Sequence, residues 1–210
     1  MFAMRIKFSK TDGARFISHL DLMRTATRAL KRANVPVYYT QGFNPHPYLV
    51  FSPPLSLGVI SRCELLDIRL ENPLLPEELQ KMLDGAFPAG INVLDVYEQE
   101  HSFNEITYAR YKLTFSETLT DKFNEFISQP QITVERRAKK GRIVQVDLKA
   151  EVEIENIKKG KIDFILPCGN EKNISVNLFS EAFRLFAKAG DMPVLVERLD
   201  FLDKDKNIFK

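Results

Sequence analysis

The chain has 210 residues, of which 44% are hydrophobic and 28% charged, a composition typical of a folded globular protein and not of a disordered one. Its apolar runs are far shorter than the roughly 20 residues that cross a bilayer, and the first residues lack the pattern of a signal peptide, so we expect a cytoplasmic protein without membrane contact. The only two cysteines, Cys63 and Cys168, lie far apart, which argues against a disulfide framework and a cysteine-based metal site.

The net charge of +2 is unevenly distributed along the chain. Residues 1–60 hold eight Lys or Arg against two Asp, so the remaining residues carry a net negative charge. A basic region raises the local concentration of anionic partners such as nucleic acid, although many such regions are only solvated surface.

The first hundred residues predict the order strand, helix, strand, strand, helix, strand. A strand is expected over 4–9, a helix from Ser18 to the residues before Pro36, an extended segment over 37–40, a strand over 64–70, a helix over 76–84 and a strand over 91–97. Ser18 and Asp21 have the spacing of a capping box. In the first helix, helical spacing predicts one inward apolar face and a separate cationic side. The expected inward residues are Leu20, Met23, Ala26, Thr27 and Leu30; the cations are Arg24, Arg28, Lys31 and Arg32.

The second half repeats this order with one additional strand. Strands are expected over 108–115, 132–137, 144–155, 161–167 and 194–202, with helices over 119–128 and 178–189. Strand-helix-strand-strand-helix-strand is the order of the ferredoxin-like motif. We therefore predict an α+β fold of two ferredoxin-like halves packed together, a first domain at 1–100 and a second at 105–210 that carries basic hairpin turns.

Three stretches of the first half combine residue types that suit a binding site. They are residues 15–24, residues 41–47 and residues 52–58. The second of them joins amide and imidazole side chains to two prolines, which restrict Asn44 and His46 to extended conformations. A rigid binding loop is expected there.

Three sequence runs occur in a fixed order: Ser18-His19-Leu20-Asp21-Leu22-Met23-Arg24, Gln41-Gly42-Phe43-Asn44-Pro45-His46-Pro47 and Pro54-Leu55-x-Leu57-Gly58. Together they resemble the bacterial radical SAM-linked (radical SAM-associated) protein family of unknown function. That family is similar to the C-terminal domain fused to some radical SAM proteins. The resemblance is dense from about residue 5 to 70, and it implies an accessory module for a radical SAM protein encoded nearby that acts on RNA or a translation-linked substrate. Because the chain lacks a three-cysteine cluster motif, it cannot hold the radical cluster itself, and we expect no cofactor.

The candidate catalytic residues are His19 and His46, because a side chain with an ordinary pKa near about 6.5 can act as a general base. His19 could equally contact a phosphate. The candidate substrate-binding or RNA-binding residues are polar or cationic and lie in the motif stretches or in a basic turn of the second half. They are Arg15, Ser18, Asp21, Arg24, Arg28, Gln41, Asn44, Arg137, Lys139 and Lys140.

Each of these residues also has a structural interpretation. Capping alone explains Ser18 and Asp21, and a solvated helix face or turn explains the cations. A metal site of His19, Asp21 and His46 is not expected, because His19 and Asp21 point to different sides of a helix.

Our leading hypothesis from the sequence is an accessory binding module that works with a radical SAM enzyme and presents or binds RNA or a translation-linked substrate. The alternative is a metal-independent RNA-processing enzyme that uses His19 or His46 as general base, with Arg24 or Arg28 opposite the developing negative charge. A third hypothesis is a purely structural subunit that binds only protein. The enzyme hypothesis borrows from other proteins with paired ferredoxin-like domains. All three leave the substrate and the oligomeric state open.

Overall fold

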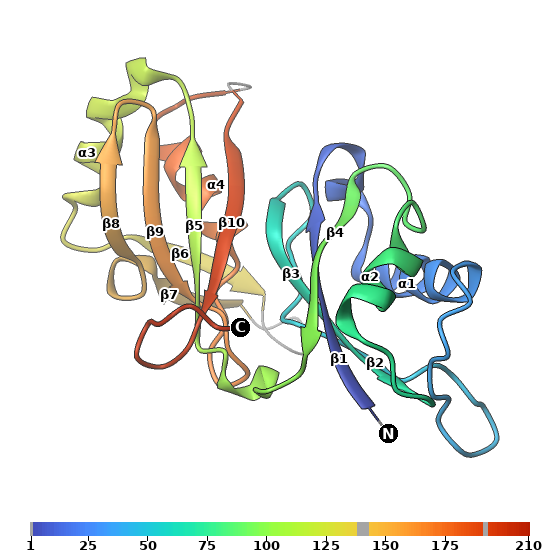
Figure 1. The fold of residues 1–210 in the computed structure, drawn as a ribbon. Coiled ribbons are helices and arrows are strands. Elements are labelled where there is room, and N and C mark those ends of the chain that lie inside the picture. Colours follow the sequence, from blue (N-terminus) through green and yellow to red (C-terminus); the bar gives the residue numbers. More distant parts are fainter. Residues whose placement is uncertain (1, 138–142, 191–192) are drawn as a thin grey trace. The chain divides into compact units, whose positions relative to one another are not determined.

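The computed structural model describes residues 2–137, 143–190 and 193–210. The chain divides into two compact units, one formed by residues 1–103 with Lys210 and the other by residues 104–209. Each unit combines helices with antiparallel strands, which confirms the predicted α+β class (Figure 1). No helix among the described residues is both long and apolar enough to cross a membrane.

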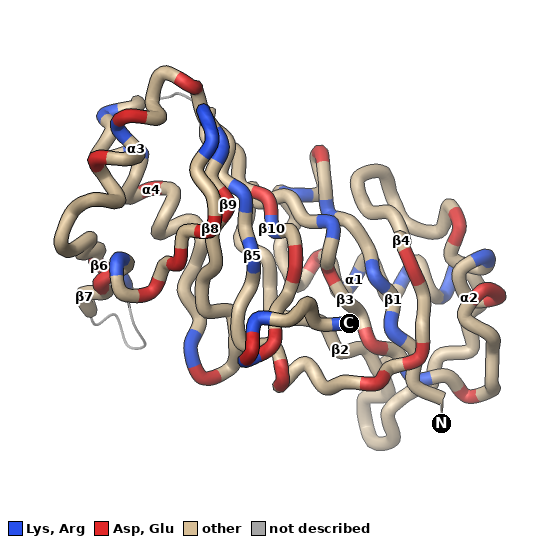
Figure 2. The backbone as a smooth tube through the Cα atoms, turned by 60° about the vertical axis from the view of Figure 1, so that its left-hand side comes forward, with Lys and Arg blue, Asp and Glu red and all other residues tan. Residues whose placement is uncertain are grey.

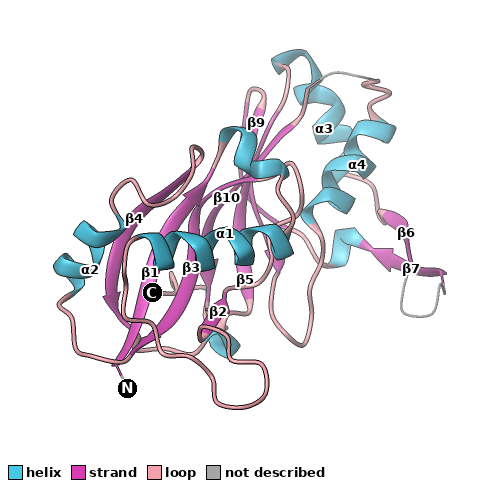
Figure 3. Ribbon diagram, turned by 90° about the vertical axis from the view of Figure 1, so that its right-hand side faces the viewer, coloured by secondary structure: helices cyan, strands magenta, loops and turns pink. Residues whose placement is uncertain are grey.

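The first unit is a four-stranded sheet with two helices. Its elements are β1 (Phe2–Lys10), α1 (His19–Arg32), β2 (Leu49–Phe51), β3 (Ile60–Leu70), α2 (Pro76–Leu83) and β4 (Ile91–Glu98). The strands lie in the order β4-β1-β3-β2, and every neighbouring pair is antiparallel. Both helices lie on one face of this sheet, as Figure 3 shows. The other face therefore receives the alternate side chains of each strand.

The core of the first unit lies between the sheet and its helices. Met4, Ile6 and Phe8 alternate along β1 and are buried, together with alternate residues of β3. The buried face of α1 consists of Leu22, Ala26, Ala29 and Leu30.

The predicted inward face of α1 was therefore only partly right. Ala26 and Leu30 are buried, but Leu20 is 54% exposed and Met23 is 36% exposed. Thr27 is only partly buried. Two apolar stripes overlap on this helix at Ala26 and Leu30, and periodicity alone does not choose between them. Contact with the side chains of β1 and β3 makes that choice.

The second unit also combines antiparallel strands with helices. Its elements are β5 (Tyr108–Thr114), α3 (Thr120–Ile127), β6 (Thr133–Arg137), β7 (Ile143–Asp147), β8 (Glu153–Lys158), β9 (Lys161–Pro167), α4 (Val176–Phe186) and β10 (Leu195–Leu202). Four strands pair in the antiparallel order β10-β5-β9-β8, and β6 pairs with β7 in a separate hairpin. Phenylalanine rings fill the core, with ring centroids 4.8 Å apart for Phe164 and Phe179 and 5.1 Å apart for Phe123 and Phe183.

The strand predicted over 144–155 is two strands in the structure. β7 ends at Asp147, a 3-10 turn follows at Leu148–Ala150, and β8 begins at Glu153. The Asp147 carboxylate accepts hydrogen bonds from the backbone N–H of Lys149 (3.0 Å) and of Ile132 (3.1 Å), which favours a turn over a continuous strand. Alternation did not reveal this turn, because Leu148 stays fully buried and keeps the apolar rhythm.

Arg5 of β1 makes a buried ion pair with several hydrogen bonds. It is fully buried and lies directly opposite Asp67 of β3, to whose carboxylate it donates two hydrogen bonds of 2.7 and 2.8 Å. The same guanidinium donates to the carbonyl oxygens of His101 (2.6 Å) and Lys210 (2.9 Å) and lies 4.4 Å from the ring centroid of Phe103. Burial raises the pKa of Asp67 above its ordinary value, and the positive charge of Arg5 opposes that rise. The buried guanidinium of Arg5 thus links β1 to β3 and to the chain segments at His101 and Lys210.

Replacing Arg5 with alanine should lower the free energy of unfolding by about 3 to 5 kcal/mol, because the buried Asp67 carboxylate would lose both of its Arg5 hydrogen bonds and its compensating charge. Urea unfolding followed by circular dichroism measures this change. Arg24→Ala, which removes an exposed cation paired with Asp21, is the control and should leave the unfolding midpoint nearly unchanged. Equal midpoints for Arg5→Ala and the wild type would contradict the assigned role.

Candidate functional site

The start of α1 is fixed by a capping interaction. The Ser18 hydroxyl accepts a hydrogen bond from the Asp21 backbone N–H (3.1 Å) and donates one to the Asp21 carboxylate (2.7 Å). This hydrogen bond from Ser18 lowers the pKa of Asp21, and Arg24 adds an exposed ion pair at 3.3 Å. Ser18, Asp21 and Arg24 therefore have local structural partners, as the capping interpretation predicted for the first two.

His19 is the first residue of α1 and lies half-buried against the sheet. Its ring meets the Phe51 ring edge to face, with centroids 5.5 Å apart and an angle of 81° between the planes. Burial lowers the pKa of His19 below its ordinary value; the nearby Glu64 carboxylate acts in the opposite direction, and the Lys10 ammonium reinforces the lowering. The lowered pKa favours the neutral form of the His19 imidazole.

Lys10 and Glu64 are buried charged residues beside His19, with 2% and 3% exposure. Lys10 ends β1, Glu64 lies near the start of β3 opposite Phe8, and the antiparallel pairing brings both to the same end of the sheet. The Lys10 ammonium donates a hydrogen bond of 2.9 Å to the Ile17 carbonyl oxygen. This bond fixes the backbone just before α1. We call His19, Lys10, Glu64 and Phe51 the His19 site.

Sequence reasoning missed Lys10 and Glu64, although a signal was present. Lys10 continues the buried alternation of Ile6 and Phe8, and Glu64 has the same parity as the buried Leu66. A charge at a core-facing strand position is uncommon unless it has a partner or a function. Parity along the strand therefore predicts both residues as members of a polar site.

The structure brings the first and third motif stretches together. The Gly58 backbone N–H donates to the Arg15 carbonyl oxygen at 2.9 Å, and a Cβ at Gly58 would lie 3.8 Å from the Phe16 ring. The Arg15 guanidinium lies 4.7 Å from the centroid of that same ring. Arg15 therefore belongs to the segment that closes over the start of α1.

The second motif stretch lies elsewhere in the first unit. Its flanking residues pair with one another and with β3, where the Tyr38 backbone N–H donates to the Arg69 carbonyl oxygen at 2.8 Å. His19 reaches the sheet at Phe51, which pairs with Leu66, three residues from Arg69 along β3. At about 3.3 Å per residue, Leu66 and Arg69 are roughly 10 Å apart along β3. The loop continues away from the strands (Figure 1).

His46 braces this loop. Its Nδ1 lies 3.1 Å from the Thr40 hydroxyl and 3.1 Å from the Asn44 carbonyl oxygen, and its backbone N–H donates to the Thr40 hydroxyl at 3.2 Å. Gln41 and Asn44 are exposed. No hydrogen bond, ion pair or ring contact found among the described residues joins His46 to His19, so the structure does not bring the two candidate bases together.

The remaining candidate residues are cations. Arg28 is exposed on α1 beside Arg24, and the tube drawing of Figure 2 marks the Lys and Arg residues of this helix in blue. The backbone of Arg137 ends β6, whereas Lys139 and Lys140 lie outside the described residues.

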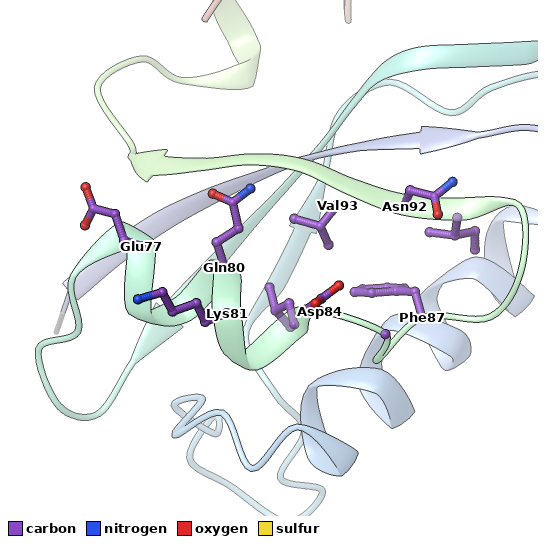
Figure 4. A pocket seen from close by; sticks show the side chains of 10 residues that line it. Glu77, Gln80, Lys81, Asp84, Phe87, Asn92 and Val93 are labelled. Atoms are coloured by element: carbon purple, nitrogen blue, oxygen red, sulfur yellow. The ribbon is translucent and has the colours of Figure 1, made fainter.

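A hollow of about 480 Å³ lies between α2 and β4 of the first unit (Figure 4). Its labelled lining residues are Glu77, Gln80, Lys81, Asp84, Phe87, Asn92 and Val93. None of the residues predicted from the motifs lines it. Within the described part of the chain, no three His, Cys, Asp or Glu side chains are grouped so as to hold a metal ion.

These features define an α+β protein of two compact units, with a half-buried neutral histidine and a braced loop in the first. A family model described as "Uncharacterized protein conserved in bacteria (DUF2344)" matches residues 3–176, and the chain belongs to this bacterial family. No curated protein matches the chain. A solved structure described as "Crystal structure of putative glycine cleavage system transcriptional repressor" matches with 12% identity and a TM-score of 0.27, over 97% of this chain and 98% of that one. This similarity carries no inference about fold or function.

Histidine titration by NMR should give His19 a midpoint below 6.5, because burial disfavours the imidazolium. Glu64→Gln should lower that midpoint further, since the Glu64 carboxylate favours the charged form. Glu71→Gln, at an exposed position, is the control and should leave the midpoint unchanged. A midpoint above 6.5, or one that rises in Glu64→Gln, would contradict this description of the site.

Proposed function

We propose that this protein is an accessory binding module that works with a radical SAM enzyme and presents or binds RNA or a translation-linked substrate in the cytoplasm. Support for the radical SAM partner is the resemblance carried by the three motif runs. Support for an anionic ligand is the cationic side of α1, where Arg24, Arg28 and Lys31 are all exposed. That exposed cationic face is the observation on which the RNA proposal depends.

We also infer that each unit is a ferredoxin-like domain, with boundaries near residues 1–100 and 105–210. The order β4-β1-β3-β2 in the first unit, with α1 and α2 as the two crossovers, supports this inference. The order β10-β5-β9-β8 supports it in the second, where the β6-β7 hairpin is the additional element. Paired domains of this kind offer several sheet and helix surfaces on which a binding module can hold two partners.

RNA binding through α1 predicts a specific salt dependence. Each phosphate contact made with single-stranded RNA contributes a slope of about 0.7 to the plot of log affinity against log salt. The double variant Arg24→Gln/Arg28→Gln should therefore bind a single-stranded RNA more weakly and with a slope smaller by about 1.4. Fluorescence anisotropy at several salt concentrations measures both quantities.

The matched control for this experiment is Lys122→Gln/Lys204→Gln, which removes two exposed cations of the second unit. It should change the slope much less. Equal slopes for both double variants, or binding that does not respond to salt, would argue against an RNA interface on α1.

The second candidate function is an RNA-processing enzyme with His19 as general base. The observation that favours it is the position of His19, which is partly exposed, neutral at pH 7 and next to two buried charges. A neutral imidazole can take the proton of a ribose hydroxyl. At about 100° per residue, Arg24 and Arg28 lie on other sides of α1 than His19, so a different donor would have to face the developing negative charge. His46 is the other base candidate; its Nδ1 is engaged with the loop, so its Nε2 would have to accept the proton.

If this alternative holds, purified protein should cleave or modify total cellular RNA, and His19→Gln should reduce the rate by at least about 100-fold. The rate should fall with decreasing pH only below about 6.5, because the lowered pKa keeps His19 unprotonated at neutral pH. His101→Gln, at an exposed position, is the control. RNA left unchanged by the wild-type protein would exclude this function for the RNA tested.

A further inference from the structure

One segment of the first unit carries no charged side chain. Residues 33–61 contain no Lys, Arg, Asp or Glu, although such residues make up 28% of the chain and Arg32 and Arg62 flank the segment. In Figure 2 the whole segment is therefore drawn in tan. Removing an uncharged surface from water carries no penalty for burying ions, so this segment suits a dry protein contact.

The tip of this segment exposes a large aromatic side chain. Phe43 is 111% exposed, more than any other large hydrophobic residue reported for the described part of the chain, and Tyr39 is 43% exposed. Gly42, next to Phe43, has φ +127°, and nothing lies within 4 Å of the position where a Cβ would stand. The backbone at the tip therefore projects clear of the unit that carries it.

Hydrogen bonds cross the base of the loop, although its tip is exposed. The Thr40 backbone N–H donates to the His46 carbonyl oxygen at 2.9 Å, the Thr40 hydroxyl and His46 bond to each other, and two prolines flank the imidazole. Below them, the Tyr48 backbone N–H donates to the Tyr38 carbonyl oxygen at 2.9 Å. These bonds and the two prolines restrict the conformations of the loop, which reduces the entropy that binding would cost.

We propose that the loop of residues 40–47 is a docking loop that inserts Phe43 into an apolar, uncharged pocket of a partner protein, with the amides of Gln41 and Asn44 bonding at its rim. Buried aromatic anchors carry much of the binding energy of protein interfaces. The proposal rests on the proposed function for the identity of the partner, the radical SAM protein, but its physical basis is independent of that identity.

The absence of charged side chains from the loop favours a protein over nucleic acid or a lipid surface as its partner. Nucleic acid and anionic lipid headgroups are attracted by Lys and Arg, and the segment has neither. The neighbouring cation, Arg69, stacks on the Tyr48 ring, 4.2 Å from its centroid. RNA would instead meet the cationic side of α1, so one unit can hold RNA and a protein partner at different places.

The test compares Phe43→Ser with Leu185→Ser, which removes a 70% exposed apolar side chain from α4 of the second unit. Immobilised wild-type protein and both variants are exposed to ribonuclease-treated lysate of the producing bacterium. A protein retained by the wild type and by Leu185→Ser but not by Phe43→Ser is then purified, and its affinity is measured directly at low and high salt. Phe43→Ser should bind it at least about tenfold more weakly, and salt should have little effect.

Three results would overturn the docking loop: equal retention of all proteins by both variants, retention of proteins by the wild type from untreated lysate but of none from the ribonuclease-treated lysate, or a wild-type self-association that Phe43→Ser abolishes. The proposed function is judged separately. A Phe43-dependent partner without a radical SAM cluster motif would support the docking loop and contradict the proposed function. Retention of a radical SAM protein by both variants alike would support the proposed function and contradict the docking loop.

Discussion

The first unit depends on one buried charge, the guanidinium of Arg5. It lies across β1 and β3 from Asp67 and also bonds the carbonyl oxygens of His101 and Lys210, so strands and segments distant in sequence share a single donor group. A buried cation is unfavourable unless its donors are satisfied, and here four contacts satisfy them. The β1-β3 register that this pair fixes also places Lys10 and Glu64 at the same end of the sheet.

That register explains why the His19 site combines apolar surroundings with two buried charges. The face of the sheet covered by helices is apolar over most of its length and becomes polar only where β1 ends and β3 begins. His19 lies at this border, where burial favours the neutral imidazole and two buried charges act on it in opposite directions. A site of this type holds a histidine neutral and oriented, which suits either a hydrogen bond to a ligand or proton transfer.

The motif stretches lie at two separate places in the first unit. The first and third meet at the start of α1 through Gly58 and Arg15, whereas the second forms a separate, braced loop with Phe43 at its tip. The cations of α1 and the uncharged loop have different physical affinities, one for anions and the other for apolar surface. Under the proposed function, this separation would let the two surfaces discriminate between an anionic and an apolar partner.

The sequence by itself determined the α+β class, most helix and strand positions and the Ser18 cap, because these follow from residues near each other in the chain. Tertiary structure decided which apolar stripe of α1 is buried, the break of the predicted 144–155 strand at Leu148, the meeting of Lys10 with Glu64 and the separation of His19 from His46. Each of these depends on strand register or on packing between distant segments, and local periodicity leaves such choices open.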